Sequence, residues 1–409
     1  MNRRGTIYLI VLSTMVLCGV VASAGLILAG IAGERVRASA DAGRARKLAQ
    51  SGLEMAGDGM LQSMAWRSGL GVKGLIATSS LDAGTITLKA TDPVDDLIAN
   101  SPDDTVVVTS EAQVGGARKM YQATFVPNTA PAPMYAYAMF AGGSITTGTA
   151  TLWSYAPLAA IGGFGLNSST FNANVVSGST ATGMTYAGTV ATGQTLAALP
   201  AAADIVAEYA ALGTEVTASG GATIVVEKLV LSPASNPLGG GTNTKGIYVI
   251  NCAGKNVTIR KCRINGTLVL RNVGAGSLVQ NSVCFDPATS GYPSLIVEGA
   301  ITLSLSGSDL SESTENINFN PAGSPYAGDT DSSKNDSYPS EFGGLVYVSG
   351  ALTVNGTLAT YAPVVCAGNI SLAMCTVKLR WANQTWAPPA FRASPDFYVT
   401  RSAWTRTVD

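Results

Sequence analysis

The residues of this chain that could carry catalysis are few, because its 409 residues include no histidine. That absence excludes Ser-His-Asp and Cys-His nucleophiles, histidine metal ligands and the side chain that most often acts as a general base near neutral pH. The sequence also contains no P-loop, no G-x-G-x-x-G before a helix and no G-x-S-x-G elbow. Most familiar hydrolase mechanisms are therefore excluded.

Carboxylates remain as candidates for polysaccharide cleavage, which needs two of them within roughly 5 to 10 Å of each other. The acidic residues near strand-rich sequence are Glu298, Asp309, Glu312 and Glu315. They lie partly in a serine-rich turn segment, with no accompanying run of arginine or aromatic residues to hold a sugar. We therefore predict a protein that is not an enzyme, with a carbohydrate-active enzyme as the weakest of three hypotheses.

A metal site has little support in the sequence. The acidic segment from Asp329 to Asp336 begins like a calcium loop, but its sixth position is Lys334 instead of glycine and its twelfth is Ser340 instead of glutamate. The cysteines form no C-x-x-C knuckle of the kind that binds zinc. We expect a solvated loop, no metal and no cofactor.

Five cysteines follow residue 250, and they form two closely spaced pairs. Cys252 and Cys262 are ten residues apart, Cys366 and Cys375 are nine apart, and Cys284 is left over. Pairs on adjacent strands could form disulfides in an oxidising compartment. Buried free thiols are an equally good interpretation, since cysteine behaves as a small apolar residue.

The composition describes a nearly neutral chain. Lys and Arg number 25, Asp and Glu number 26, and the net charge of −1 provides no general field to attract nucleic acid. Charged residues make up 12% of the chain, about half the usual quarter. This balance suits an exported protein that is rich in strands and turns, with no nucleic-acid partner.

The N-terminus carries a membrane signal. Residues 5–33 form a run of 29 residues without a charge, and about 20 apolar residues are enough to span a bilayer as a helix. Arg3 and Arg4 precede this run, so the positive-inside rule places the N-terminus in the cytoplasm and the rest of the chain outside it. We assign residues 6–33 to a single transmembrane helix.

Two processing sites compete at this segment. Ala22-Ser23-Ala24 is an A-x-A site, at which a signal peptidase would cut near Gly25 and release the rest of the chain. The alternative is a short basic leader, residues 1–5, that ends in Gly5 and is followed directly by Thr6 and the apolar run. Cleavage between Gly5 and Thr6 would leave the helix attached.

The helix is predicted to continue through residues 34–68. This segment has no proline and many helix formers, and Leu53, Ala56, Met60 and Met64 recur at steps of three and four. Continued to about Trp66, the helix would have roughly 60 residues and a length of about 90 Å at 1.5 Å per residue.

The leader, the apolar helix, the basic and polar stretch after it and the segment Arg46-Lys47-Leu48-Ala49-Gln50-Ser51-Gly52-Leu53-Glu54-Met55-Ala56 together resemble the N-terminal region of PilX-type minor pilins and of the large minor pseudopilins of type II secretion. The resemblance covers about residues 1–66. It implies cleavage by a prepilin peptidase, other pilin-like subunits as partners, and a place in the bacterial inner membrane and in a type IV pilus or pseudopilus.

One position departs from the common pilin pattern. Most pilins carry glutamate at the fifth mature position, which is Ile10 here if cleavage follows Gly5. The large minor pseudopilins also lack this glutamate, and in those families the lack is associated with a position at the filament tip. A buried carboxylate needs a partner, and a first subunit has no neighbour above it to supply one.

Residues 69–126 are predicted to form a small pilin-like β domain. Residues 69–80 are expected to be a linker or turn, residues 84–90 alternate as a strand does, and residues 105–112 and 119–126 flank Gly115-Gly116 as a β-hairpin does. The apolar stripe of the helix would pack on this sheet. Three prolines in residues 127–133 then predict a stiff extended linker.

Residues 134–382 contain short β-rich clusters separated by turns. Residues 264–268, Ile-Asn-Gly-Thr-Leu, match residues 354–358, Val-Asn-Gly-Thr-Leu, and this internal similarity indicates stacked repeats. We predict a right-handed parallel β-helix-like solenoid, with a β-sandwich as the alternative. Residues 196–212 are expected to form a helix, residues 316–342 a projecting loop, and residues 383–409 a C-terminal tail or cap.

The fold class predicted for the whole chain is thus α+β followed by all-β. The leading functional hypothesis is a non-enzymatic, membrane-anchored and exported structural protein that resembles a minor pilin and displays a β-helical head. The alternative is a secreted or surface-anchored β-helix that acts as an adhesin or binding module. The sequence indicates no ligand for the head.

Overall fold

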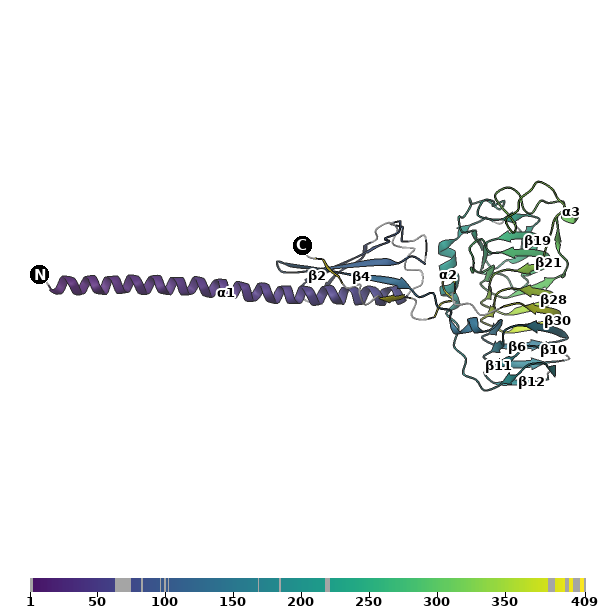
Figure 1. Cartoon of the computed structure of the whole chain (residues 1–409), viewed down its shortest axis with the longest axis horizontal. Helices are drawn as coiled ribbons and strands as arrows, with labels where there is room; N and C mark the ends of the chain where they lie inside the picture. The colour runs from purple at the N-terminus through teal and green to yellow at the C-terminus, as the bar shows by residue number, and fades with distance from the viewer. Residues whose placement is uncertain are drawn as a thin grey trace.

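The computed structural model of the chain describes residues 3–62, 75–81, 84–95, 97–98, 101, 103–167, 169–183, 185–217, 221–381, 387–393, 397–399 and 405–407. A long N-terminal helix, a small antiparallel sheet and a larger β-rich region follow one another along the molecule (Figure 1). The predicted order of a long apolar helix, a small sheet and a β-rich C-terminal region is confirmed.

Helix α1 (Arg3–Gln62) runs without a break through the predicted transmembrane segment and into its continuation. Every side chain from Ile7 to Ala40 is exposed in the structure. The N-terminal part is long and apolar enough to cross a membrane, with a mean hydropathy of 2.4 over its most apolar stretch and none of that stretch buried. The predicted helix residues 63–68, with Met64 and Trp66, lie outside the described residues.

The C-terminal part of α1 is covered on one face. Ala45, Ala49, Leu53, Ala56 and Met60 are buried and recur at steps of three and four, which places them on one side of the helix. This face packs on strands β2, β3 and β4. The predicted stripe is therefore confirmed for Leu53, Ala56 and Met60, and two alanines extend it toward the membrane-facing end.

The small sheet has strand order β1-β2-β3-β4-β31, with antiparallel pairing throughout its described strands. Its first four strands are β1 (Leu75–Leu81), β2 (Gly84–Thr91), β3 (Val106–Val114) and β4 (Ala117–Pro127). The predicted hairpin is confirmed, since Val114 pairs with Ala117 across Gly115, which has a φ of +55°. The linker predicted for residues 69–80 is corrected in part, because β1 completes a ladder with β2 from Leu75 onward.

The C-terminus was predicted to be a tail or cap for residues 383–409, and this is wrong for its described strands. Strands β31 (Phe397–Val399) and β32 (Thr405–Thr407) return to the small sheet and pair with β4. The physical reason is that β4 has 11 residues and one edge left free by β3, and an open edge favours another strand. The β-rich region is therefore an insertion between β4 and β31.

We call this insertion, residues 133–393, the head. It contains two large sheets in which all pairings among the described strands are parallel. An antiparallel β-sandwich, the alternative fold, does not fit this pairing. The 3₁₀-helix η2 (Pro133–Ala136) leads into the first strand.

The ten-stranded sheet contains β5 (Met139–Ala141), β8 (Leu158–Ala160), β11 (Val175–Ser177), β14 (Val190–Ala191), β15 (Thr214–Glu215), β18 (Ile247–Asn251), β20 (Thr267–Arg271), β22 (Leu295–Val297), β27 (Val346–Val348) and β29 (Val364–Cys366). The fourteen-stranded sheet contains β6 (Ser144–Thr147), β7 (Ala150–Ser154), β9 (Gly163–Leu166), β10 (Thr170–Asn172), β12 (Thr180–Thr182), β13 (Thr185–Tyr186), β16 (Thr223–Glu227), β17 (Val230–Leu231), β19 (Asn256–Asn265), β21 (Leu278–Asp286), β23 (Ile301–Leu305), β26 (Glu341–Phe342), β28 (Leu352–Thr360) and β30 (Ile370–Leu379). Apolar side chains from both sheets form one continuous core.

The parallel strands of the two large sheets follow one another in successive levels, and we call this arrangement the stack. The chain enters and leaves the head at the middle of the stack. From β5 it runs through β8 and β11 to β14 at one end, and it resumes at β15 at the other end. It then returns to β29, where Val364 pairs with Met139 of β5. In Figure 1 the last strands, in yellow, accordingly lie beside the first strands of the head, in blue.

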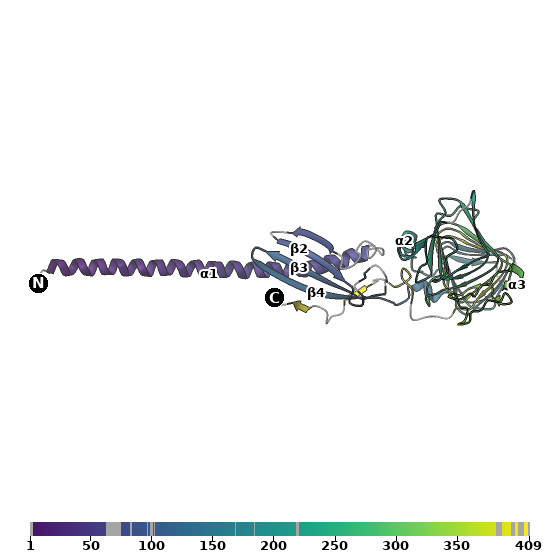
Figure 2. The same ribbon diagram turned by 90° about the horizontal axis from the view of Figure 1, so that it is seen from above.

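Helix α2 (Ala202–Leu212) connects the two ends of the stack. It packs on β18 and β20 and lies on the side of the head that faces the small sheet (Figures 1 and 2). The helix predicted for residues 196–212 is thus confirmed from Ala202 to Leu212, whereas residues 196–201 are not helical.

A column of left-handed residues forms the bend in the long strands of the head. Lys228, Lys261, Asn281, Gly356 and Met374 all have positive φ, between +46° and +76°. The strand registers shift at two of these points, between Arg260 and Cys262 and between Asn355 and Gly356. Each bend changes the direction of its strand. One long strand therefore carries two short apolar clusters instead of one long cluster.

Met374 is the position in this column where a substitution should stabilise the fold. Its side chain is 82% exposed, and its φ of +46° costs a non-glycine residue roughly 1 kcal/mol or more. We expect Met374→Gly to raise the free energy of unfolding by about 1 kcal/mol and the midpoint of thermal unfolding by about 2 °C. Ala373→Gly is the control in ordinary backbone, and equal destabilisation by both variants in calorimetry would contradict the prediction.

Residues 306–340 interrupt the stack between β23 and β26. Strand β21 pairs with β23 through its first half and with β26 through its second half, and β28 does the same, so the four strands form a closed ring of pairings. The insert contains β24 (Leu310–Ser311), the short helix α3 (Glu312–Glu315) and β25 (Ser337–Tyr338). β23 and β26 therefore share one level of the stack.

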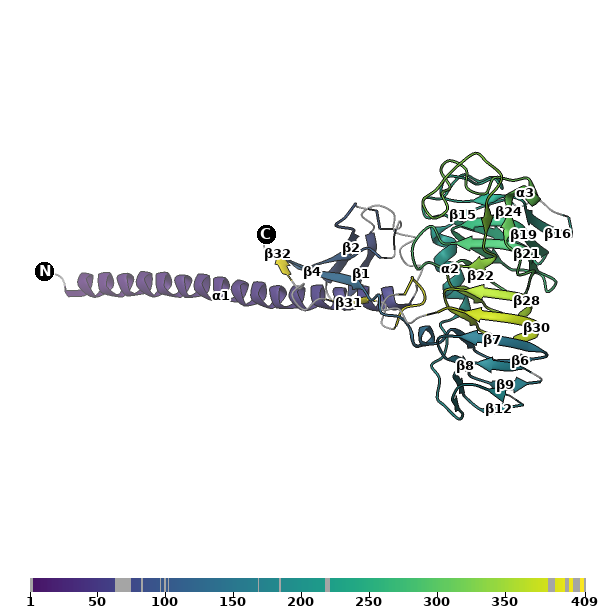
Figure 3. The same ribbon diagram turned by 45° about the vertical axis from the view of Figure 1, so that its right-hand side comes forward.

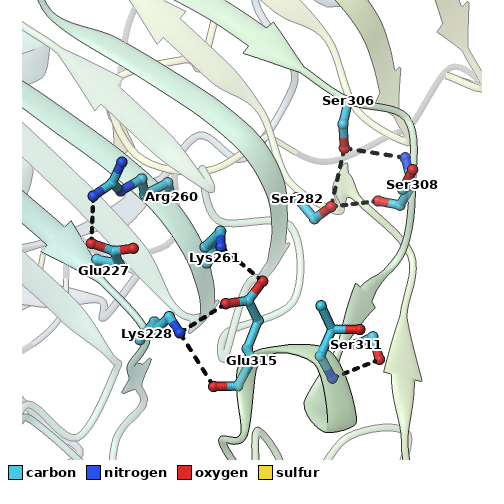
Figure 4. Close-up of polar contacts among 10 residues, drawn as sticks. Glu227, Lys228, Arg260, Lys261, Ser282, Ser306, Ser308, Ser311 and Glu315 are labelled. Atoms are coloured by element: carbon cyan, nitrogen blue, oxygen red, sulfur yellow. Dashed lines mark hydrogen bonds and ion pairs between the residues drawn. The ribbon is translucent and has the colours of Figure 1, made fainter.

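The insert was predicted to project as a loop, and this is corrected. It folds down on the strands because it carries apolar residues of its own: Phe319 and Tyr338 are buried in a second cluster with Cys284, Val230 and Leu310. Polar contacts hold its other end, where the Glu315 carboxylate accepts from Lys228 at 3.2 Å and from Lys261 at 3.1 Å (Figure 4).

Arg263, a residue of β19, bonds the insert to the strands on which it packs. Its guanidinium is fully buried, and it donates to the carbonyl oxygens of Phe319 and Ser324 at 2.8 Å each and to that of Pro325. Its carbon Cζ lies 5.1 Å from the ring centre of Tyr326. One side chain of the stack therefore satisfies three carbonyl groups of the insert.

Candidate functional site

The predicted processing residues, Gly5 and Thr6, lie in the first turns of α1. A cut between them would leave the whole apolar stretch on the mature chain. A cut after Ala24 would leave only residues 25–33 of that stretch, too few to span a bilayer. The two cleavage sites therefore lead to different proteins, one anchored and one released.

Three hydroxyl groups within the apolar stretch, those of Ser13, Thr14 and Ser23, are bonded to the helix backbone itself. Ser13 donates to the Ile10 carbonyl at 3.0 Å, and Ser23 donates to the Gly19 carbonyl at 2.6 Å. Thr14 bonds the helix backbone in the same way. Such hydroxyls leave no unpaired donor for lipid to accommodate, so the exposed part of α1 is suited to a bilayer.

Cys252, Cys262, Cys366 and Cys375 are buried free thiols in the structure, which agrees with the second of the two interpretations and not with the possible disulfides. Cys366 lies in β29 and Cys375 in β30, strands that belong to different sheets. Cys252 follows β18 of the ten-stranded sheet, whereas Cys262 lies in β19 of the other. Each pair is therefore separated by a turn of the chain from one sheet to the other.

These thiols are core residues. Burial raises the pKa of Cys252, Cys366 and Cys375 to about 11 and that of Cys284 to about 12. Burial also raises the pKa of Cys262. A thiol with a raised pKa carries little thiolate near neutral pH and is a poor nucleophile.

Three of the four acidic residues considered for catalysis have structural partners, and the fourth, Asp309, is exposed. Glu312 is buried and accepts from the backbone of Phe319 at 2.5 Å and from the Tyr338 hydroxyl at 2.8 Å. Burial acts to raise the pKa of Glu315, but the hydrogen bonds from Lys261 and Lys228 outweigh burial and hold this pKa below its ordinary value. Glu298 lies 3.9 Å from Arg271. These three carboxylates therefore serve the fold.

The acidic loop ends beside Glu312. Carboxylate oxygens of Asp331, Asp336 and Glu312 lie within 4.8 Å of one another. Asp329, the first residue of the segment that resembles a calcium loop, instead pairs with Tyr326 in an isolated bridge. The segment therefore brings Asp331 and Asp336 to Glu312, whereas Asp329 lies in a separate turn with Tyr326.

The described part of the head has a groove on the outer face of the fourteen-stranded sheet. It has a volume of about 400 Å³ and runs between β7 and β30, which lie side by side in Figure 3. Its walls are formed by alternate, outward-facing residues of the two strands and by the residues that follow them. They are Thr151, Trp153, Tyr155, Thr376, Lys378 and Arg380, with the flanking Val377 and Leu379.

Two aromatic side chains form one wall of the groove. Trp153 is 55% exposed and Tyr155 is 72% exposed, and their ring centres lie 6.5 Å apart in a T-shaped arrangement. Opposite them, Lys378 is exposed, and the Arg380 guanidinium lies 5.1 Å from the ring centre of Tyr361. The groove thus combines aromatic faces with positive charge.

Glu341 places a negative charge beside this surface. Its carboxylate lies 3.9 Å from Arg380, and burial raises its pKa although Arg380 acts to lower it. The charge of Arg380 is therefore partly balanced, whereas Lys378 forms no ion pair with any residue that the structure describes.

Sequence reasoning missed the groove, because its two strands are more than 200 residues apart. A local signal was present in both. In Trp153-Ser154-Tyr155 and Lys378-Leu379-Arg380 the large aromatic or charged side chains stand at alternate positions, which places them on one face of a strand.

No family model matches the chain, and no curated protein matches it. Among solved structures, the competence-associated pilin ComZ from Thermus thermophilus is 13% identical, with 90% of this chain and 98% of ComZ covered and a TM-score of 0.30. An ice-binding protein from an Antarctic biological consortium is 12% identical, with 61% and 90% covered and a TM-score of 0.23. An ice-binding protein from the Antarctic ascomycete Antarctomyces psychrotrophicus is 11% identical, with 61% and 98% covered and a TM-score of 0.22.

At these identities and TM-scores none of the three similarities bears on what this chain does. Two parts of the molecule remain as candidate functional surfaces on the geometry alone. One is the uncovered apolar part of α1, and the other is the groove between β7 and β30.

Proposed function

We propose that this chain is a non-enzymatic, membrane-anchored subunit of a type IV pilus or pseudopilus, resembling a minor pilin, that displays a β-helical head. The observation that carries the proposal is the division of α1. One unbroken helix has every side chain exposed from Ile7 to Ala40 and then a buried face from Ala45 to Met60 on an antiparallel sheet. A long apolar stretch with nothing to cover it needs lipid or neighbouring helices.

The pairing of the strands supports a solenoid as the fold of the head. Strands in both large sheets add in parallel at successive levels, and the long strands bend at one stacked column of left-handed residues. Apolar residues from every level join one core. Stacked levels of this kind bury inward residues that a single short strand could not bury.

The orientation follows from charge. Arg3 and Arg4 precede the apolar stretch, so the N-terminus lies in the cytoplasm and the small sheet and the head lie on the other side of a bacterial inner membrane. The partners of such a subunit are a prepilin peptidase, acting between Gly5 and Thr6, and other pilin-like subunits in contact with α1. Ile10 at the fifth mature position favours a place at the filament tip.

The processing site tests this function directly. We expect Gly5→Val to block maturation and to leave a protein that is five residues longer in the membrane, because the peptidase would no longer find the glycine that ends the leader. Intact-mass and N-terminal peptide mass spectrometry of protein recovered from membranes measures the change. The matched variant Ala24→Leu, which alters the competing A-x-A site, is expected to leave the N-terminus at Thr6.

The second candidate function is a secreted or surface-anchored binding module. The exposed aromatic groove on the head favours it. The same mass measurement separates the two, since a start near Gly25 in wild-type protein, abolished by Ala24→Leu, would give a released binding module and overturn the filament proposal.

A further inference from the structure

Among the described residues of the head, the exposed aromatic ones gather at one place. Trp153, Tyr155 and Tyr361 are 55%, 72% and 44% exposed, whereas Trp381, Tyr209 and Tyr347 are fully buried in the core. Large aromatic surface left in water is unfavourable by roughly 25 cal/mol per Å² of apolar area. A cluster of such side chains on one face marks a binding surface.

Strand register fixes how these residues alternate with the cations. Trp153 pairs with Lys378 on the neighbouring strand and with Asn172 on the other side. Tyr155 and Arg380, two residues further along these strands, form a second row of outward-facing side chains. The backbone of Tyr155 donates to the Leu379 carbonyl at 3.2 Å, and that of Arg380 donates to the Thr360 carbonyl at 2.8 Å, so the two residues lie side by side. In both rows, an aromatic side chain and a cation thus lie on adjacent strands, and neighbouring strands are about 4.8 Å apart.

The second row extends to a third strand. The Tyr361 backbone donates to Phe342 at 3.1 Å, and the Arg380 guanidinium lies over the Tyr361 ring. Thr151 and Thr376, which pair in the strand register, add two hydroxyl-bearing side chains to the lining. Flat apolar faces, hydroxyls and cations on one rigid sheet are suited to a ligand with flat faces, many hydroxyls and some negative charge.

The sparse charge of the groove decides between the ligands that have these properties. Only Lys378 and the partly balanced Arg380 supply positive charge. Single-stranded nucleic acid carries a charge on every nucleotide, and its binding depends on grooves with many cations along the backbone. A polysaccharide with occasional carboxylates needs only a few cations.

We propose that the groove between β7 and β30 binds an acidic polysaccharide. Its sugar rings lie on the faces of Trp153 and Tyr155, and its carboxylates meet Lys378 and Arg380. This activity goes beyond filament assembly, since it needs only the folded head and would be present in protein that is not assembled.

The test uses the full-length chain in detergent micelles and isothermal titration calorimetry. The probes are partly methyl-esterified oligogalacturonate and partly methyl-esterified alginate oligosaccharides, in which only some sugars keep a carboxylate, and fully methyl-esterified oligogalacturonate, which has the same rings without the charge. We expect the first two to bind more tightly than the full ester. Trp153→Ala and Tyr155→Ala should each weaken binding of all probes about tenfold or more, as loss of a central aromatic contact does.

Charge is tested separately by Lys378→Gln, which should weaken binding of the acidic probes and leave the ester unchanged. Tyr398→Ala, at a tyrosine that is 53% exposed on the small sheet, is the aromatic control and should bind as wild type does. The proposal is overturned if no polyuronate binds, if the groove variants bind as the control does, or if oligodeoxythymidylate binds more tightly at the same residues. Each result is independent of where the N-terminus is cut.

Discussion

Replacing Arg263 with alanine is expected to release residues 306–340 from the head and to lower the free energy of unfolding by about 3 to 5 kcal/mol. The variant would leave the buried carbonyl groups of Phe319 and Ser324, and the partly buried one of Pro325, without their donor. Each buried group left unpaired costs about 1 to 3 kcal/mol. The insert should then become a preferred site of proteolysis.

The effect is large because Arg263 is held on several sides. Burial lowers the pKa of its guanidinium, while Asp286, at 3.9 Å, and the faces of Tyr326 and Tyr338 favour the charged form. Arg263→Lys should recover little of the stability, since a single ammonium group cannot reproduce the planar set of donors that reaches three carbonyls.

Arg260 provides a matched control on the same strand. It pairs with Glu227 at 2.7 Å, but its side chain is 36% exposed, and an exposed pair of this kind contributes about 1 kcal/mol or less (Figure 4). Limited proteolysis with mass mapping, together with denaturant unfolding, compares the two variants. Equal stability of Arg263→Ala and Arg260→Ala, with residues 306–340 still resistant, would show that Arg263 does not hold the insert.

The second large effect is expected at Gly52, where α1 lies directly on the small sheet. A Cβ atom at this position would lie 2.2 Å from the Ser110 hydroxyl oxygen and 2.8 Å from a methyl carbon of Ile86. Gly52→Val should therefore push the helix away from β2 and β3 and lower the free energy of unfolding by about 3 kcal/mol, the upper part of the usual range for overpacking. Hydrogen exchange should rise in β2 and β3.

Gly43 in the same helix is the control, because a Cβ atom there would meet nothing within 4 Å. Gly43→Val should be neutral or slightly stabilising, since valine is a better helix residue than glycine. A second control combines Gly52→Ala with Ser110→Ala, which removes the atom that comes closest. If Gly52→Val leaves hydrogen exchange in β2 and β3 unchanged, α1 does not pack closely on the sheet at Gly52, and the prediction is wrong.

The parts of the fold that sequence reasoning found are those with a local pattern. The uncharged run of α1, the stripe of Leu53, Ala56 and Met60, and the hairpin around Gly115 each lie within a few turns or strands of contiguous chain. Periodicity at such short range is visible in one sequence, because each side chain's direction follows from its neighbours.

The parts that it missed depend on contacts between distant segments. The pairing of β31 with β4 and that of β29 with β5 join segments more than 200 residues apart, and neither short strand carries a local sign of its partner. The cysteine spacing misled for the same reason, since residues nine or ten positions apart are here carried onto different sheets. The groove at Trp153 and Lys378 exists only once β7 and β30 are side by side.

The position at which the head joins the small sheet has a mechanical consequence. The chain enters and leaves the head at the middle of the stack, where the two connecting segments are bonded to each other, as between Ala132 and Phe391 and between Thr129 and Ala387. Tension between α1 and a ligand held on the head would therefore be shared by the covalent segment that follows β4 and by the returning segment, which is held to the small sheet through the pairing of β31 and β32 with β4. It would load the central level of the stack, and the end strands β14 and β15 would not be peeled away one level at a time.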